Sequence, residues 1–353
     1  MAEAPPRRRL SRGRRALFGA VMVGLMVLLL EGGLRLAGLP AGIVRSFGGL
    51  WQRDAAALAA QPGLFRPGTH RVAFPPELAY DVTIDALGLR GTEPAAPAPT
   101  PGRPRVLCVG DSVTFGFYVS DAQTYPARLD ARLRARGLAA EVLNAGCGHL
   151  TITDERRWLE EKLLALRPAV VVLQFCANDV DPSELDAQPT QYEQLLAEAQ
   201  GPSLADRLRQ TAIGEAQLRL AIALKRARPP SLTMAALPEV PEERWARYEA
   251  ELKVIRDFVQ RAGATLVLVP FPDLVLAHGT GPSPYEARLK AACDRLGIGF
   301  RGPLDDFRAA AAGDPDGLYH WPLDLHGSAR GCDALAGSVE TLLVEKGLLG
   351  RPR

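Results

Sequence analysis

A serine, a histidine and an acid stand in this sequence where nucleophilic catalysis would need them. Ser112 lies in the stretch GDSVTFG, directly after the apolar run RVLCV, and His326 lies in the stretch DLH near the C-terminus. A serine hydroxyl becomes a nucleophile when a histidine accepts its proton and an acid orients the other ring nitrogen. Asp324 is placed to be that acid. The same residues could instead be a helix cap and a solvated loop histidine. The rival candidates for the base are His149 and His320.

Two further segments could donate hydrogen bonds to the oxyanion that such a reaction forms. NAGCGH (144–149) follows a second apolar run, and CAND (176–179) follows a third. The backbone N–H of Gly148, or of Gly146 as the alternative, can approach a substrate closely because glycine has no side chain. The amide of Asn178 can donate a second hydrogen bond. A plain glycine turn and an Asn-Asp turn would explain both segments without function.

Strands alternate with helices over most of the chain. We expect strands at 105–109, 141–145, 169–175, 265–271 and 298–302, and helices at 124–136, 153–166, 241–263, 283–296 and 328–346. Such alternation produces right-handed crossovers and a parallel sheet covered on both faces. The sequence therefore predicts an α/β fold, a three-layer α/β/α doubly wound arrangement with a mainly parallel five-stranded sheet. Active sites in such sheets form at the carboxyl ends of the strands, where the candidate residues fall.

The remaining segments predict a domain order. We expect a basic cytoplasmic tail at 1–15, a transmembrane helix at 16–39, a membrane-proximal region with a Pro-rich linker at 40–103, and a catalytic domain at 104–348. Residues 181–240 are polar and interrupt the alternation, so they are interpreted as a helical insertion within that domain.

The N-terminal segment predicts a membrane anchor. Residues 16–30 carry no charge, and the apolar stretch is long enough for the roughly 20 residues that span a bilayer. Arginines before residue 16 should stay in the cytoplasm, which puts the rest of the chain on the extracytoplasmic side, the periplasm in a Gram-negative cell. A cleaved signal peptide is the alternative, but no clear small-residue cleavage site follows the apolar run. We therefore expect a single-pass protein of the inner membrane.

Charge and cysteine content exclude some other classes of protein. The net charge is +2, but six of the 42 basic residues and only one of the 40 acidic residues precede residue 16. The rest of the chain is slightly acidic, which argues against a nucleic-acid surface. Five scattered cysteines without CxxC spacing form neither a disulfide framework nor a zinc site. We expect no metal and no cofactor.

Taken together, these motifs resemble the blocks of the GDSL/SGNH hydrolase superfamily. The resemblance covers roughly residues 104–346 and implies the flavodoxin-like SGNH fold. It implies Ser112 as nucleophile and oxyanion N–H donor, Gly148 and Asn178 as further donors, and Asp324 and His326 as the rest of the triad. Gly110, Asp111 and Gly116 complete the first block.

The sequence departs from the family pattern in three places. The second block is one residue shorter than its common form, and Cys176 occupies the usual glycine of the third block. The acid usually precedes the base by three residues, where this chain has Leu323, so Asp324 must serve. The stretch YDVTIDALGLRG (80–91) is also similar to membrane-anchored bacterial members of unknown substrate.

The expected function is that of a serine esterase acting on a short-chain acyl or acetyl ester of a small molecule or glycan. One alternative is an O-acyltransferase that acts on an extracytoplasmic glycan. A second, from another class, is a non-catalytic, membrane-tethered binding protein built on the same fold. The membrane is the one partner beyond the substrate that the sequence predicts, through the N-terminal helix, and protein partners are left open.

Overall fold

The chain forms two compact units. One comprises Met1–Ile43 with Ser203–Ala227, and the other comprises Val44–Pro202 with Arg228–Arg353. The computed structural model describes residues 11–39, 47–72, 78–91, 96–180, 190–198, 211–217 and 240–349, with the single residues Leu204, Leu208 and Leu220. All the candidate site residues lie in the second unit.

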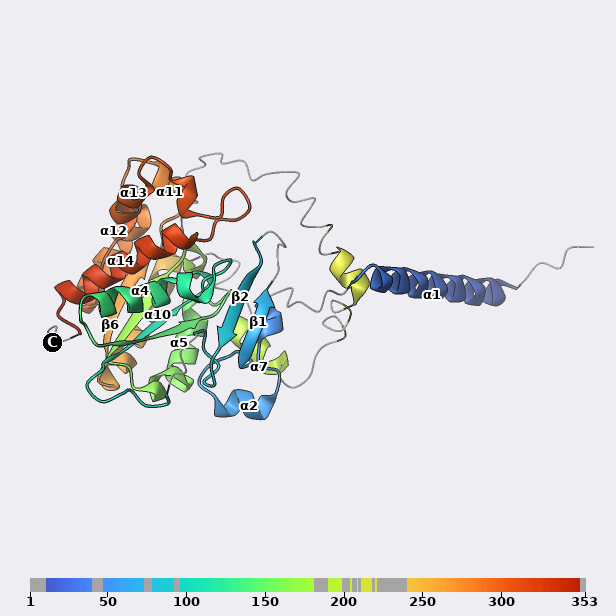
Figure 1. Cartoon of the computed structure of the whole chain (residues 1–353), viewed down its shortest axis with the longest axis horizontal. Helices are drawn as coiled ribbons and strands as arrows, with labels where there is room; N and C mark the ends of the chain where they lie inside the picture. The colour runs from blue at the N-terminus through green and yellow to red at the C-terminus, as the bar shows by residue number, and fades with distance from the viewer. Residues whose placement is uncertain are drawn as a thin grey trace, which may run out of the picture. The chain divides into compact units, whose positions relative to one another are not determined.

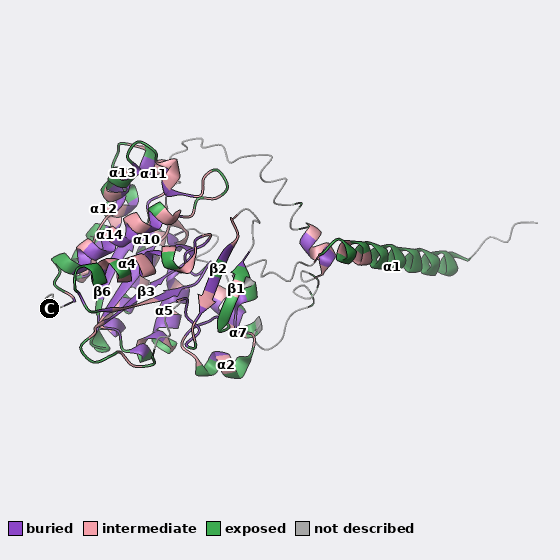
Figure 2. Ribbon diagram, in the orientation of Figure 1, coloured by how far each residue is buried: buried purple, intermediate pink, exposed green. Residues whose placement is uncertain are grey.

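Helix α1 (Arg12–Leu36) is the main element of the first unit. The Ser11 side chain caps it by accepting a hydrogen bond from the backbone N–H of Arg14. Its most apolar 18-residue window has a mean hydropathy of 2.1, and none of that window is buried. Figure 2 shows the helix exposed along its length. Twenty-five residues of helix span about 37 Å, more than the roughly 30 Å hydrocarbon core of a bilayer. The helix is therefore long and apolar enough to cross a membrane, a test that a signal sequence also passes.

Part of the predicted insertion belongs to this first unit. Near the end of α1, Glu31 accepts hydrogen bonds from the backbone N–H groups of Ala212 (3.1 Å) and Ile213 (3.0 Å). Glu31 also pairs with Arg35 at 2.8 Å. Another part, helix α7 (Gln191–Glu198), belongs to the second unit, where Tyr192 is fully buried. Most of the rest of 181–240 lies outside the described residues.

A five-stranded parallel sheet forms the centre of the second unit (Figure 1). The strand order is β4-β3-β5-β6-β7, so the chain runs outward from β3 in two directions. The bounds are Arg105–Gly110 for β3, Glu141–Gly146 for β4, Val170–Phe175 for β5, Thr265–Pro270 for β6 and Gly299–Phe300 for β7. This confirms the predicted fold class and places the five predicted strands within about two residues of their expected ends. Strands β3 and β5 are buried at every position, which is why their sequences lack alternation.

Helices cover both faces of the sheet. Alternate residues of each strand point to opposite faces, so Leu107 and Val171 join one core cluster while Val106 and Val170 join the other. The first cluster includes side chains of α5 (Ile152–Glu161), α10 (Glu242–Arg261) and α12 (Pro284–Leu296). The second includes side chains of α4 (Tyr125–Ala135), α11 (Leu274–His278), α13 (Leu304–Ala311) and α14 (Ala329–Glu345). The strands therefore lie between two helical layers, as Figure 2 shows by their burial.

The region 47–91 belongs to the same compact unit as the five-stranded sheet. It contains α2 (Ala55–Ala60) and the antiparallel strands β1 (Gly68–Val72) and β2 (Tyr80–Ile84). Its buried residues, among them Leu64 and Val82, join the same core cluster as Leu107 of β3. Arg90 forms an isolated bridge with Asn144 of β4, at the edge of the main sheet. The region is therefore packed into the catalytic unit, because its apolar residues are buried on that unit's core.

Smaller differences concern helix ends. The sequence predicts one helix over 153–166, whereas α5 ends at Glu161 and a 3-10 turn follows at Leu163–Leu166. Helices α11 and α13 lie where no element is expected. Both are short, so they carry too few apolar repeats to give a clear periodic signal.

Candidate active site

Ser112 lies on a tight turn at the carboxyl end of β3. It is the first residue of the short helix α3 (Ser112–Phe115), and Asp111 caps this helix by accepting a hydrogen bond from Val113 N–H at 2.9 Å. Gly110 has no room for a side chain, because a Cβ there would lie 2.2 Å from the Thr114 hydroxyl oxygen. Burial raises the pKa of Asp111. The strand, the cap and the glycine together hold the hydroxyl of Ser112 in one place.

Two more glycines let the surrounding backbone close around this turn. Gly116 ends α3 with φ of +88°, a conformation that residues with a Cβ rarely adopt. A Cβ on Gly146 would lie 2.0 Å from the backbone nitrogen of Phe115, so β4 can pack against α3 only with glycine at that position. The backbone N–H of Gly146 donates to the Asn144 side chain at 3.0 Å. Gly146 therefore has a structural reason to be glycine, and its N–H is already engaged.

The structure brings Ser112, His326 and Asp324 into one hydrogen-bonded chain. His326 Nε2 lies 2.7 Å from Ser112 Oγ, and His326 Nδ1 lies 2.5 Å from Asp324 Oδ1. The same carboxylate oxygen accepts a hydrogen bond from the His326 backbone N–H at 3.0 Å. Burial acts to raise the pKa of Asp324, but the hydrogen bonds and charge of His326 outweigh it and lower that pKa to about 2. Leu323, at the usual position of the acid, is 41% exposed.

A short loop between the 3-10 turn Asp316–Leu318 and α14 carries both Asp324 and His326. Tyr319 and Gly327 form an antiparallel bridge across its base. The His320 backbone N–H donates to the carbonyl oxygen of His326 at 2.9 Å, and its carbonyl oxygen accepts from Asp324 N–H at 3.0 Å. This closed loop fixes the distance between the acid and the base, which have one residue, Leu325, between them along the chain.

Of the five histidines, all of which lie in the described residues, His326 is the one that hydrogen-bonds to Ser112. His149 is exposed, with φ of +67°. His320 lies beside Tyr118, with ring centroids 5.7 Å apart, and burial lowers the pKa of its imidazole. Geometry therefore favours His326 over both rivals.

Gly148 and Asn178 lie at the ends of the strands on either side of β3. Gly148 is buried in the turn after β4. Asn178 lies in the 3-10 turn Ala177–Val180 after β5, and its amide nitrogen is 3.4 Å from the carbonyl oxygen of Leu150. The neighbouring Asp179 accepts the backbone N–H of Cys176 at 3.0 Å, which holds this turn closed. Both candidate donors thus stand at the carboxyl edge of the sheet, as their places after β4 and β5 predict.

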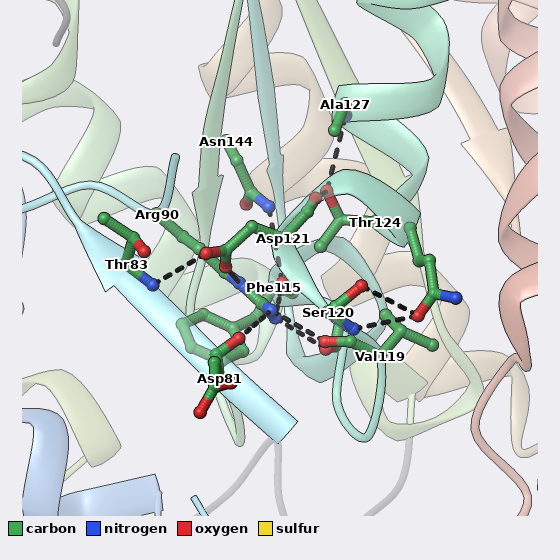
Figure 3. A network of polar contacts seen from close by, with 12 residues as sticks. Asp81, Thr83, Arg90, Phe115, Val119, Ser120, Asp121, Thr124, Ala127 and Asn144 are labelled. Atoms are coloured by element: carbon green, nitrogen blue, oxygen red, sulfur yellow. Dashed lines mark hydrogen bonds and ion pairs between the residues drawn. The ribbon is translucent and has the colours of Figure 1, made fainter. Parts of the chain in front are cut away.

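Sequence reasoning missed three residues that surround the triad. The Phe117 ring lies 5.1 Å from the His326 ring, and the Tyr118 ring lies 5.5 Å from it. Arg90 does not contact the triad, but it donates hydrogen bonds to carbonyl oxygens of the loop that carries the two aromatic residues. Figure 3 shows Arg90 with Phe115 and Val119 of that loop. The stretch ALGLRG, which contains Arg90, was noted in the sequence as a feature shared with other proteins. A sequence pattern does not show which residues Arg90 contacts in the fold.

Within the described residues, no group of three or more histidine, cysteine, aspartate or glutamate side chains is placed to hold a metal ion. The cysteines of this part of the chain are unpaired thiols.

Comparison with known proteins gives one family match. A model of the GDSL-like lipase/acylhydrolase family matches residues 108–334, nearly two thirds of the chain. No curated protein matches the chain significantly. Among solved structures, a variant of Axe2, an acetyl-xylooligosaccharide esterase from Geobacillus stearothermophilus, is similar to this chain. The match has 19% sequence identity and a TM-score of 0.42, and it covers 68% of this chain and 94% of that one. The structure of TesA is also similar, with 17% identity, a TM-score of 0.40, and a match that covers 69% of this chain and 99% of that one.

Proposed function

The chain belongs to the GDSL-like lipase/acylhydrolase family and is an ester-hydrolysing enzyme, and on this premise we propose that it is a serine esterase with Ser112 as nucleophile. The observation that carries the proposal is the chain of hydrogen bonds from Ser112 through His326 to Asp324, at 2.7 and 2.5 Å. These distances lie within the reach that proton transfer and orientation of the base require.

In the proposed mechanism His326 Nε2 takes the proton of Ser112 as the hydroxyl oxygen attacks the carbonyl carbon of the ester. Asp324 holds the ring and stabilises the imidazolium that forms. The backbone N–H groups of Ser112 and Gly148 and the amide of Asn178 donate to the oxyanion. The intermediate then collapses, the alcohol leaves with the proton of His326, and an acyl-Ser112 ester remains. Water, activated by His326, hydrolyses that ester and restores the free serine.

The acid of the triad is Asp324 in this proposal. Asp324 accepts two hydrogen bonds from His326, one from the ring and one from the backbone, whereas Leu323 has no group that could orient an imidazole. Its carboxylate is ionised at neutral pH, and although burial acts to raise its pKa, the hydrogen bonds and charge of His326 lower that pKa to about 2. An ionised acid is what the mechanism needs to stabilise a protonated histidine.

We further propose that α1 anchors the enzyme in a membrane with its arginines in the cytoplasm and residues beyond about 40 outside it. The support is the length and apolar surface of α1 together with the arginines that precede it. Carbonate extraction of membranes, with an epitope tag at each end, tests this. An anchor keeps both tags on one membrane-bound chain of full length, whereas a cleaved signal peptide would leave the N-terminal tag on a separate fragment.

The first test of the reaction uses the full-length chain in detergent and the release of p-nitrophenol from p-nitrophenyl acetate. We expect Ser112→Ala and His326→Ala to abolish turnover while keeping the thermal unfolding temperature of the parent. Full activity in Ser112→Ala would contradict the proposal. A folded parent chain that releases no p-nitrophenol unless a sugar acceptor is added would favour an O-acyltransferase over a hydrolase.

A further inference from the structure

The loop that follows α3 places two aromatic rings, those of Phe117 and Tyr118, beside the ring of His326, the candidate base. The Phe117 ring is tilted by 33° relative to the His326 ring, and the Tyr118 ring meets the His326 ring edge-on at 84°. Tyr118 has φ of +65°, which is uncommon for a residue with a bulky side chain. Such backbone strain persists only where surrounding contacts hold it, and it concentrates at functional sites.

The side chain of Tyr118 reaches the acid as well as the base. The Tyr118 side chain adds to the lowering of the pKa of Asp324 that His326 produces, so the phenol lies beside this carboxylate. Two other ionisable groups lie beside Tyr118: His320, with ring centroids 5.7 Å apart, and Tyr80, with ring centroids 6.1 Å apart. Tyr118 thus lies beside Asp324 and against the ring of His326, the two residues whose relative orientation the mechanism depends on.

Contacts from the N-terminal region hold Tyr118 where it is. The Tyr80 and Tyr118 rings meet edge to face, with centroids 6.1 Å apart. Arg90 donates to the carbonyl oxygens of Phe115 (2.9 Å), Gly116 (2.6 Å) and Val119 (2.7 Å), on both sides of Tyr118 (Figure 3).

The charge of Arg90 is fully compensated in this position. Its guanidinium also pairs with Asp121 at 2.8 Å and lies over the Phe115 ring, 4.8 Å from the centroid. With 1% of its side chain exposed, Arg90 could not adopt another arrangement without leaving buried carbonyl oxygens unpaired. Arg90 therefore fixes the loop 115–119 through three of its backbone carbonyl oxygens.

We propose that Tyr118 is a positioning residue of the catalytic triad, which donates a hydrogen bond to Asp324 and thereby fixes the acid and the ring of His326, and that Arg90 holds the loop that presents it. The inference rests on the proposed function, because it assigns a role toward the same triad. Tyr118 acts on the substrate only through Asp324 and His326. A hydroxyl donor on Asp324 restricts the carboxylate to one rotamer and takes up part of its charge.

Tyr118→Phe in the full-length enzyme tests this, with Tyr192→Phe as the matched control. Tyr192 is fully buried, and its hydroxyl donates to a carboxylate, that of Glu161, at 3.0 Å, so the control removes the same kind of hydrogen bond elsewhere in the same unit. We expect Tyr118→Phe to lower kcat about tenfold, the size of one hydrogen bond to a charged group, with little change in KM. We also expect the acidic limb of its kcat/KM profile to move to higher pH, since Asp324 would keep more charge to stabilise the imidazolium. Tyr192→Phe should change neither quantity.

A second readout separates failure of this inference from failure of the proposed function. The proton between His326 Nδ1 and Asp324 gives a far-downfield proton NMR signal, which Asp324→Asn identifies by removing it. We expect Tyr118→Phe to shift that signal and Tyr192→Phe to leave it in place, whether or not the chain hydrolyses the ester tested. An unshifted signal in Tyr118→Phe would overturn the inference, as would a fall in kcat matched by the control.

Discussion

The loops at the carboxyl edge of the sheet and the region 47–91 contribute to the candidate site in opposite ways. The loops supply the groups of the proposed reaction, Ser112 after β3 and His326 before α14, and these contact one another through side chains. The region 47–91 supplies no group to the proposed reaction, yet Arg90 holds the loop 115–119 through backbone carbonyl oxygens. The first region thus holds the residues that would take part in the proposed reaction. The second holds residues that fix the positions of the first through hydrogen bonds and packing. Changes in the first group should remove activity at a smaller cost in stability, and changes in the second should lower both.

The largest effect should come from the acid of the proposed triad. Asp324→Asn keeps the shape of the side chain but can no longer hold His326 in the tautomer that accepts the Ser112 proton. We expect kcat to fall about 10⁴-fold, as in serine hydrolases whose acid is replaced by its amide, with KM nearly unchanged. Steady-state kinetics on p-nitrophenyl acetate measures this. Leu323→Asn is the matched control, because the side chain is 41% exposed and outside the hydrogen-bonded chain. Equal activity of Asp324→Asn and parent would remove Asp324 from the mechanism.

The oxyanion donor should give the next largest effect. Asn178→Ala removes one proposed hydrogen bond to the transition state, which typically costs about 2.7–4 kcal/mol of barrier, or a 10²- to 10³-fold lower kcat. KM should change little, because the oxyanion exists only in the transition state. A variant with unchanged kcat would mean that the amide of Asn178 serves only the turn after β5, where it meets the carbonyl oxygen of Leu150.

A change in the region 47–91 should lower stability and activity together. Arg90→Lys keeps the positive charge but loses the planar fork that serves several carbonyl oxygens. We expect the free energy of unfolding to fall by about 3 kcal/mol, because each lost hydrogen bond to a charged group is worth about 1.5–3 kcal/mol and the lysine recovers part of them. Urea unfolding followed by circular dichroism gives this value.

Arg71→Lys is the control for that experiment. Arg71 of β1 forms a surface ion pair with Asp81 of β2, within the same region as Arg90, and 54% and 58% of the two side chains are exposed. Its replacement should cost well under about 1 kcal/mol. If both variants lost equal stability, burial of Arg90 would not be the reason for its effect, and the contrast between the two regions would fail.

The smallest effect should appear in the dependence of stability on pH. The folded-state pKa of Asp324 is lowered to about 2, below its value of about 3.9 in an unfolded chain. Its ion pair therefore adds stability above about pH 4, and that stability is lost as pH falls from about 4 to 2. The full contribution is at most about 3 kcal/mol, and partial solvent exposure reduces it. The difference in unfolding free energy between parent and Asp324→Asn should shrink over that pH window, and a constant difference would contradict the lowered pKa.

Buried acids elsewhere in the unit titrate in the opposite direction. Burial raises the pKa of Asp111, of Asp179 and of Glu155, so these groups resist ionisation and give stability that falls as pH rises. The comparison of Asp324→Asn with the parent at each pH isolates Asp324 from this background.

Local sequence determined the strands, most helices and the nucleophile turn. Parallel strands that are buried on both faces have continuous apolar sequences, so β3 and β5 could be predicted from the sequence. The Ser112 turn needs a strand end, a capping Asp111 and glycines, all within seven residues. The long apolar α1 was likewise evident, because its signal depends on composition alone.

Tertiary structure decided the contacts between segments far apart in the chain. The choice of His326 over His320 and His149 rests on a hydrogen bond that spans 214 residues. Two other features also join distant segments: the region 47–91 packs onto the core of the catalytic unit, and Arg90 hydrogen-bonds to the loop after Ser112. A sequence pattern reports periodicity and local turns. The contacts of a buried guanidinium with particular carbonyl oxygens depend instead on how the helices and strands pack in the folded protein. Arg90 and Tyr118 acquire their places only in the folded chain for that reason.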